Sequence, residues 1–244
     1  MSLADWTGGR RAMDRTHVAY AVGVVCMVPT IGAVVFLPAW TLDYWQAWVL
    51  LAVIVVSYGV AIAGSVARGE PAPLRPRKPE GPRLETPRLE TPASQQIIVF
   101  LVSLGLLALL IVPGFDHRYG WSSVPPPISL AADLLVAAGV LITYQVTQEL
   151  VRRSYATSEQ TPDQRMVSTG PFAVVRHPTH AGTLLYQAAI PLALGSWYGL
   201  VAFAVILPLS LVRIFYEDKL LQQIVPDYSD YTQQVKYRLL PRVW

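Results

Sequence analysis

Charged and aromatic side chains gather in the last third of a chain that is otherwise strongly hydrophobic. The residues that could do chemistry there are Arg176, His177, His180, Arg213, Glu217, Asp218, Tyr228, Tyr231 and Arg238. Guanidinium and imidazolium groups bind anions, and carboxylates bind ammonium groups. A site that combined both kinds of side chain would suit a ligand that carries both charges.

The sequence GPFAVVRHPTHAG at residues 170–182 carries the first charged group. Proline is favoured in the first turn of a helix, so we expect a helix to begin near Pro178. The free N–H groups and the dipole of that helix favour an anion, and Arg176 and His177 add to this preference. Gly182, one turn later, would let a ligand or another backbone approach closely. A cationic membrane anchor capped by proline explains the same residues equally well.

Arg213 and Glu217 are four residues apart in RIFYEDKLL at the predicted end of a long helix, so they share one face of it. They could form a salt bridge, although Arg before Glu is the less favourable order for such a pair. Alternatively, Glu217 and Asp218 could bind an ammonium group beside the basic residues. On residue types alone the two interpretations carry equal weight.

Hydrophobic segments must position these residues. The chain is 53% hydrophobic and 14% charged, with a mean hydropathy of +0.39, whereas soluble domains carry about 25% charged residues. A bilayer span needs roughly 20 apolar residues. Segments that approach this length are 17–40, 45–67, 95–115, 128–150 and 197–216, and a shorter one covers 178–195.

The segments predict an all-α polytopic membrane helix bundle of about six spans, with the last two as a candidate helical hairpin. Residues 1–94 would form a two-helix membrane region and a Pro- and Arg-rich cytoplasmic loop. Residues 95–244 would form the core with a cytoplasmic C-terminal region. Pro29, Pro191 and Pro208 fall inside the segments and predict kinks rather than helix ends.

The distribution of lysine and arginine predicts the orientation of the bundle. Eighteen of the 19 basic residues fall in the termini and alternate loops, and Arg118 alone falls in the other loops. The positive-inside rule then places both termini, and the charged groups, in the cytoplasm. Arg10, Arg11 and Arg15 precede an apolar run that is too long for a signal peptide, so we expect a retained first helix.

Aromatic residues cluster at the predicted outer turns. They are Trp40, Tyr44, Trp45, Trp48, Trp121, Trp197 and Tyr198. Such residues are typical of the belt that lies at a membrane interface, and we assign them no chemistry.

The sequence predicts no metal site. Cys26 is the single cysteine, which excludes an internal disulfide and a cysteine-based site. The histidines form no convincing ligand set, because His17 and His117 belong to different ends of the bundle. A glycine-rich phosphate loop, an HExxH motif and a nucleophile elbow are also missing from the sequence. We expect a lipophilic acceptor and membrane lipids as partners, and no nucleic acid.

Several segments, taken in order, resemble the isoprenylcysteine carboxyl methyltransferase family, which is related to the phospholipid methyltransferases. The resemblance is strong over residues 168–244, through STGPFAVVRHPTHAGTLL, GSW, RIFYEDKLL and PDYSDYTQQVKYRLLPRVW. TLDYWQAW at 41–48 and RPRKPEG at 75–81 resemble the bacterial branch. The positions that match the family motif are Gly170, Pro171, Arg176, His177, Pro178, Gly182, Arg213, Glu217, Tyr228, Tyr231 and Arg238.

Three positions depart from the motif. Phe172 stands where the motif G-P-Y has Tyr, and His180 stands where R-H-P-x-Y-x-G has Tyr. Asp218 replaces the second of two glutamates. The change at His180 bears on cofactor contacts and on the choice of acceptor, whereas the shorter Asp218 would weaken an ammonium contact.

The resemblance implies a methyltransferase that uses S-adenosylmethionine (SAM), in the cytoplasmic membrane of a bacterium. The helix start with Arg176 and His177 would favour the SAM carboxylate, and Glu217 and Asp218 would favour its ammonium group. The aromatic side chains that would flank the adenine are those of Phe172, Tyr228 and Tyr231. The remaining motif residues would complete this cytoplasmic pocket.

The acceptor would enter from the bilayer, and we expect a carboxylate of the isoprenylcysteine type or of a small isoprenoid or lipid acid. Arg213 would orient that carboxylate through its planar fork. An ionised carboxylate needs no general base, so alignment and water exclusion would supply catalysis. An amine or hydroxyl acceptor would need a base, for which His180 and Glu217 are the nearest candidates.

Two other functions fit part of the sequence. A membrane reductase would place the phosphates of NADPH on the basic cluster, although Glu217 and Asp218 would repel them. A non-enzymatic membrane protein, such as a small transporter or assembly factor, would bind no cofactor. Binding of adenosyl compounds or of NADPH by the purified protein distinguishes these three functions.

Overall fold

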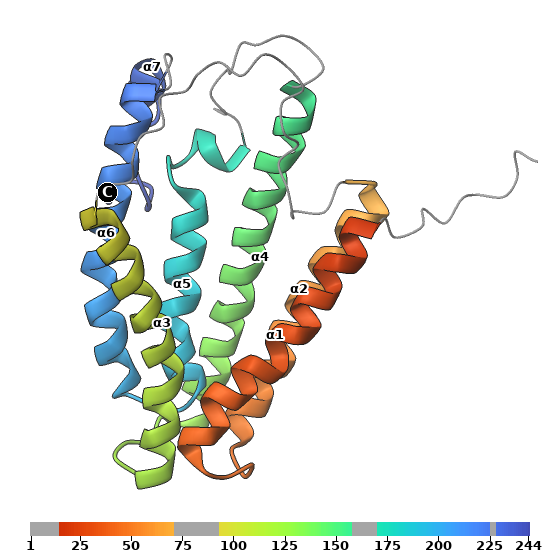
Figure 1. Ribbon diagram of the computed structural model, residues 1–244, viewed down its shortest axis with the longest axis vertical. Helices are drawn as coiled ribbons and strands as arrows, with labels where there is room; N and C mark the ends of the chain where they lie inside the picture. Colours follow the sequence, from red (N-terminus) through yellow and green to blue (C-terminus); the bar gives the residue numbers. More distant parts are fainter. Residues whose placement is uncertain (1–14, 71–92, 158–169, 225–227) are drawn as a thin grey trace, which may run out of the picture.

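Helices make up most of the computed structural model, which describes residues 15–70, 93–157, 170–224 and 228–244 (Figure 1). The elements are α1 (Arg15–Ala39), α2 (Trp45–Arg68), α3 (Ala93–Tyr119), α4 (Pro126–Thr157), η2 (Gly170–Ala173), α5 (Pro178–Ala193), α6 (Gly199–Ile224) and α7 (Tyr228–Gln234). No strand occurs in the described ranges, in agreement with the predicted all-α class. Most of the predicted Pro- and Arg-rich loop lies outside them, and the division into two regions at residue 94 stays a prediction.

Among the described residues, five helices are long and apolar enough to cross a membrane, namely α1, α2, α3, α4 and α6. Helix α5 has 16 residues, so it is about 24 Å long and shorter than a hydrocarbon core of about 30 Å. It runs antiparallel to α6 (Figure 1) after a turn at Gly195, whose φ of 77° favours glycine. All six predicted hydrophobic segments are therefore helical, and the last two form the predicted hairpin.

Some helix ends differ from the prediction. Helix α6 continues through Pro208 to Ile224, so the charged residues 213–218 lie inside the helix and not at its end. Pro29 and Pro191 likewise lie inside α1 and α5, which confirms that these prolines do not end the helices. Neighbouring helices tolerate such prolines within a membrane bundle.

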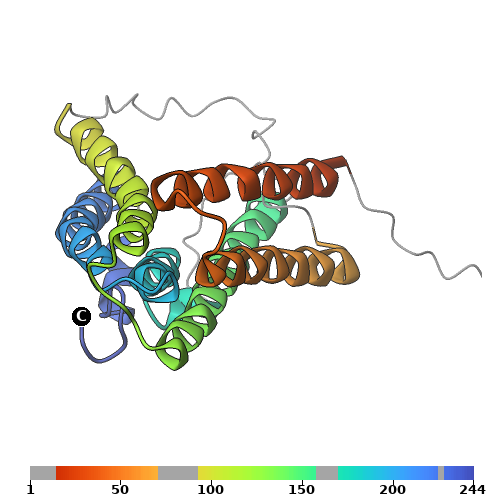
Figure 2. The same ribbon diagram turned by 90° about the horizontal axis from the view of Figure 1, so that it is seen from below.

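Glycines allow close approach of the helices that carry the charged residues. A Cβ atom on Gly139 of α4 would lie 2.7 Å from the carbonyl oxygen of Gly182 in α5. A Cβ atom on Gly105 of α3 would overlap Ile206 of α6. Figure 2 shows α4 against α5 and α3 near α6, with α1 and α2 together to one side. Small residues at such contacts are the usual means of close packing between membrane helices.

One end of the bundle is joined by hydrogen bonds around the buried Asp116 of α3. Its carboxylate accepts hydrogen bonds from the backbone N–H of Ser122 at 2.7 Å and from the hydroxyls of Ser122 and Ser196. The backbone N–H of Trp197 donates to the Ser122 hydroxyl at 3.1 Å. These bonds join the α3–α4 loop to the α5–α6 turn, so these two of the predicted outer turns lie at the same end of the bundle.

Tyr44 is the exception among the predicted interface aromatics. It is 1% exposed, stacks on His117 with 3.9 Å between ring centroids, and donates a hydrogen bond to the carbonyl of Leu194. The prediction that Tyr44 belongs to the interface belt is therefore wrong, because its ring belongs to the core. The exposed members are Trp40, Trp45, Trp48, Trp121, Trp197 and Tyr198.

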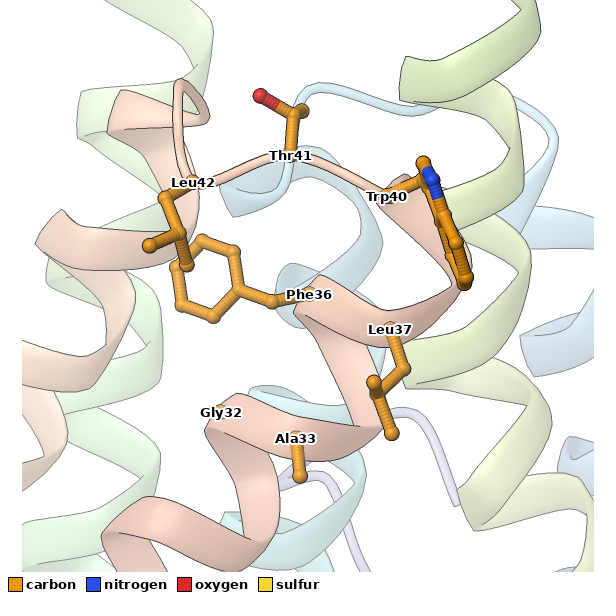
Figure 3. A pocket seen from close by; sticks show the side chains of 7 residues that line it. All are labelled: Gly32, Ala33, Phe36, Leu37, Trp40, Thr41 and Leu42. Carbon is orange, nitrogen blue, oxygen red and sulfur yellow. The ribbon is translucent and has the colours of Figure 1, made fainter.

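An open apolar pocket lies at the same end, where α1 leads into α2 (Figure 3). Its lining residues are Gly32, Ala33, Phe36, Leu37, Trp40, Thr41 and Leu42. None of them is charged, so this pocket offers no partner for an ionic ligand. The charged residues of the predicted site lie at the opposite end, where α7 lies.

Candidate functional site

Asp218 is the centre of a buried polar cluster at the end of the bundle where α7 lies (Figure 1). Its carboxylate accepts hydrogen bonds from Arg176 Nη1 at 2.9 Å, His177 Nε2 at 3.2 Å and Arg238 Nε at 3.0 Å. The hydroxyl of Tyr228 donates a fourth, short hydrogen bond to the same group. This set of five residues, the Asp218 cluster, joins α6 to the start of α5, to α7 and to the C-terminal tail.

The charged groups of the Asp218 cluster pair with one another. Arg176 and Asp218 were both predicted to contact the cofactor, but their side chains are 7% and 3% exposed and pair with each other. A buried charge is costly unless it is paired, so each of these two groups holds the other in place. One donor is left over, because Arg176 Nε is buried without a hydrogen-bond partner.

Main-chain hydrogen bonds hold the C-terminal tail against the residues that precede α5. The backbone N–H of Arg176 donates to the carbonyl of Tyr237, and that of His177 donates to the carbonyl of Arg238, both at 2.9 Å. The guanidinium of Arg238 also lies 4.9 Å from the ring centroid of Phe215, a cation–π contact with α6. The tail is thus part of the site framework.

The short helix η2 positions the backbone before the cluster. Gly170 has a φ of 65°, which favours glycine, and begins η2 at the surface. The carbonyl of the buried Phe172 accepts a hydrogen bond from the Tyr231 hydroxyl at 2.7 Å. Burial raises the pKa of Tyr231 to about 12 and raises that of Tyr228 as well, so both hydroxyls remain donors at neutral pH. These aromatic residues hold α7 to the site.

Helix α5 begins at Pro178, as predicted, with Pro178 in the first turn and His177 before it. Pro171 is exposed in η2. A Cβ atom on Gly182 would lie 2.6 Å from Thr143 Oγ1 in α4. The same Cβ position lies 3.0 Å from the carbonyl oxygen of Gly139, so of the two partners considered for Gly182, a ligand or another backbone, the structure shows the backbone of α4.

His180 and Glu217 form an accessible pair beside the Asp218 cluster. His180 Nε2 lies 3.6 Å from Glu217 Oε2, and the two side chains are 24% and 42% exposed. Glu217 therefore pairs with His180, and the salt bridge considered between Arg213 and Glu217 does not form. Arg213 is exposed on α6 and has no hydrogen bond or ion pair with the part of the chain that the structure describes.

The structure brings the predicted site residues to one end of the bundle, but only some of their side chains are accessible to a ligand. Arg176, His177 and Asp218 are buried, whereas the accessible ionisable groups are those of His180, Arg213 and Glu217. The pairing of the tail backbone with residues 176–177 is not predicted from the sequence. No side-chain motif encodes that pairing, and the signal available was a polar tail after the last long helix.

Residues 128–227 match the model of the phospholipid methyltransferase family. No curated protein matches the chain. The matched segment contains most of α4 and all of η2, α5 and α6, and therefore the accessible residues His180, Arg213 and Glu217. This match confirms the predicted relation to the membrane methyltransferases, and the bacterial branch stays a prediction. Over residues 128–227 the chain is thus similar to the phospholipid methyltransferase family, and the structure adds five helices that are long and apolar enough to cross a membrane among the described residues.

Proposed function

We propose that this protein transfers a methyl group from SAM to the carboxylate of a lipophilic acceptor at the site beside the Asp218 cluster. The observation that carries the proposal is Arg213, an exposed guanidinium without an ion-pair partner in the described chain. It lies four residues before Glu217 on the same helix. An unpaired cation next to an accessible carboxylate provides separate contacts for two ligand groups of opposite charge.

The residues present fit the zwitterionic end of SAM. Glu217 is half-exposed, so its carboxylate can accept hydrogen bonds from the cofactor ammonium group. The free N–H groups in the first turn of α5 favour the cofactor carboxylate. When bound, SAM supplies a methyl group on a positively charged sulfur. The buried Asp218 cluster holds α5 and α6 in the positions from which these contacts are made.

Arg213 would bind and orient the acceptor carboxylate. Its planar guanidinium can donate two parallel hydrogen bonds to a carboxylate, which a lysine cannot reproduce. A carboxylic acid is ionised at neutral pH, so this acceptor requires no base from the protein. The contribution of the chain is then to align the reacting groups and to exclude water.

A lipid amine is the second candidate acceptor, in keeping with the name of the matched family. The observation that favours it is the distance of 3.6 Å between His180 Nε2 and Glu217 Oε2. A carboxylate beside an imidazole orients the ring and supports it as a proton acceptor. An ammonium group must lose a proton before its nitrogen can be methylated, so this acceptor needs such a base. His180 would therefore act as a base for an amine acceptor, whereas a carboxylate acceptor would need no base.

The chemical stability of the product distinguishes these acceptors. Purified protein in lipid nanodiscs would be incubated with methyl-labelled SAM, a long-chain isoprenoid acid and phosphatidylethanolamine. A methyl ester releases its label as volatile methanol in alkali, whereas an N-methyl group does not. We expect alkali-labile label in the lipid fraction, and alkali-stable label would establish the amine instead.

Arg213→Lys provides the matching test of the residue. Loss of the bidentate contact should reduce ester formation by about tenfold or more, because a hydrogen bond to a charged group contributes about 1.5–3 kcal/mol. Arg118→Lys, at the other end of the bundle, is the control and should retain the rate. Equal rates in Arg213→Lys and the unmodified protein would contradict the role of Arg213, and no label in either lipid would contradict methyl transfer to these acceptors.

A further inference from the structure

His177, His180 and Glu217 bring three possible metal ligands together at the edge of the Asp218 cluster. One ligand atom from each residue lies within 4.8 Å of the other two. The His180 Nε2 and Glu217 Oε2 atoms are 3.6 Å apart. Two ligands on one tetrahedral Zn²⁺, with bonds of about 2.0–2.2 Å, lie roughly 3.3–3.6 Å apart. Small side-chain rotations would therefore bring these atoms to a single ion.

The local structure prepares the two imidazoles for this geometry. His177 and His180 are separated by one turn at the start of α5, and their rings are perpendicular with 5.7 Å between centroids. Asp218 Oδ1 lies 3.2 Å from His177 Nε2 and fixes that ring, which leaves Nδ1 for a ligand. Carboxylate–histidine contacts of this kind orient the histidine in metal sites.

The ligand set selects a class of metal. Two imidazoles and one carboxylate suit divalent first-row transition metals, whereas Mg²⁺ and Ca²⁺ prefer oxygen ligands. Arg213, one turn before Glu217 in α6, adds positive charge nearby. The affinity of this site would therefore come from chelation by its three ligands and not from a net negative charge.

We propose that His177, His180 and Glu217 bind a divalent transition-metal ion such as Zn²⁺, and that this ion competes with the cofactor for Glu217. The metal site stands on its own geometry, whereas the competition rests on the proposed function. His180 occupies the position where the family motif has Tyr. The site would consequently be a property of this chain that the motif does not carry.

Cobalt is the probe for the metal site, because Co²⁺ in a tetrahedral protein site absorbs visible light much more strongly than the hydrated ion does. Untagged, metal-free protein in detergent should bind one Co²⁺ per chain, and Zn²⁺ should displace it. His180→Tyr removes one ligand and should weaken Co²⁺ binding by about tenfold or more. Glu217→Gln should have a similar effect from a different helix.

His117→Gln is the control, since His117 lies at the other end of the bundle and should not contribute to Co²⁺ binding. Thermal unfolding of each variant checks that it is folded. Failure of the folded, unmodified protein to bind Co²⁺ would overturn the metal site. Unchanged Co²⁺ affinity in folded His180→Tyr would overturn it as well.

Calorimetry with S-adenosylhomocysteine tests the competition separately. One equivalent of Zn²⁺ should weaken S-adenosylhomocysteine binding by the unmodified protein, and this effect should disappear in His180→Tyr. An affinity that is independent of Zn²⁺ in the unmodified protein would overturn the competition. Bound Co²⁺ without any binding of S-adenosylhomocysteine would support the metal site and contradict the proposed function, so the two failures are distinguishable.

Discussion

Asp218 and Glu217 are adjacent carboxylates that the fold uses differently. Successive residues on a helix point about 100° apart, so one of the pair can face the protein while the other faces outward. Asp218 accepts hydrogen bonds from four buried or half-buried side chains, whereas Glu217 is 42% exposed and near His180. Asp218 therefore stabilises the site, and Glu217 is the carboxylate that remains accessible to a ligand.

Asp218→Asn tests this division of roles at the residue scale. Removing one charge of a buried ion pair costs about 3–5 kcal/mol, because the other charge is left uncompensated. We expect Asp218→Asn to lower the unfolding temperature of the detergent-purified protein strongly. Glu217→Gln is the matched control and should change it little. Equal unfolding temperatures for Asp218→Asn and the unmodified protein would show that the cluster does not stabilise the fold.

At the scale of elements, the contact between α4 and α5 sets the position of the site. Helix α5 is short, and it carries His177, Pro178 and His180 at its start. Its alignment with α4 depends on Gly139 and Gly182, which leave no room for a Cβ atom between the two backbones. A change at this contact should therefore shift the position of His180, which lies two residues before Gly182 in α5.

Gly139→Ala tests the α4–α5 contact. The added Cβ atom would lie 2.7 Å from the Gly182 carbonyl, so the helices must separate. Overpacking of this kind costs about 1–3 kcal/mol, and the unfolding temperature should fall. Gly59→Ala, in α2, is the control because nothing lies within 4 Å of its Cβ position. Equal unfolding temperatures for these two variants would contradict the close contact.

The sequence predicts the helices better than it predicts the contacts between them. Hydrophobic length located all six membrane-type segments, and Pro178 marked the start of α5. These features depend on composition and on local backbone preference. The pairing of Arg176 with Asp218 depends on the packing of the start of α5 against α6. The residue types alone are equally consistent with contacts from these two side chains to a ligand. The burial of Tyr44 is not predicted for the same reason, because its hydroxyl bonds to the carbonyl of Leu194, which is 150 residues away in the sequence.

At the scale of the whole molecule, the two ends of the bundle differ in chemistry. The end with Asp116 carries the exposed tryptophans and the apolar pocket, and the other end carries the Asp218 cluster. In the sequence, 18 of the 19 basic residues fall in the termini and in the alternate loops that are predicted to share the side of the Asp218 cluster. The positive-inside rule therefore predicts that the candidate site faces the cytoplasm.

Cysteine labelling tests this orientation. Cys26 would first be replaced by Ala, and a single cysteine would be introduced at Ser123 or at Gln233, which are exposed at opposite ends. A membrane-impermeant maleimide should label Ser123→Cys in intact cells. It should label Gln233→Cys only after permeabilisation. The reverse pattern would overturn the predicted orientation.

Binding of S-adenosylhomocysteine to the detergent-purified protein, measured by calorimetry in metal-free buffer, is the decisive test of SAM binding at Glu217. We expect binding by the unmodified protein and by Glu70→Gln, a surface control that loses its ion pair with Arg68. Glu217→Gln should bind about tenfold or more weakly, because it loses a charge-assisted contact to the ligand ammonium group. Binding of NADPH without binding of S-adenosylhomocysteine would contradict the use of SAM, and equal binding by Glu217→Gln would contradict the role of Glu217.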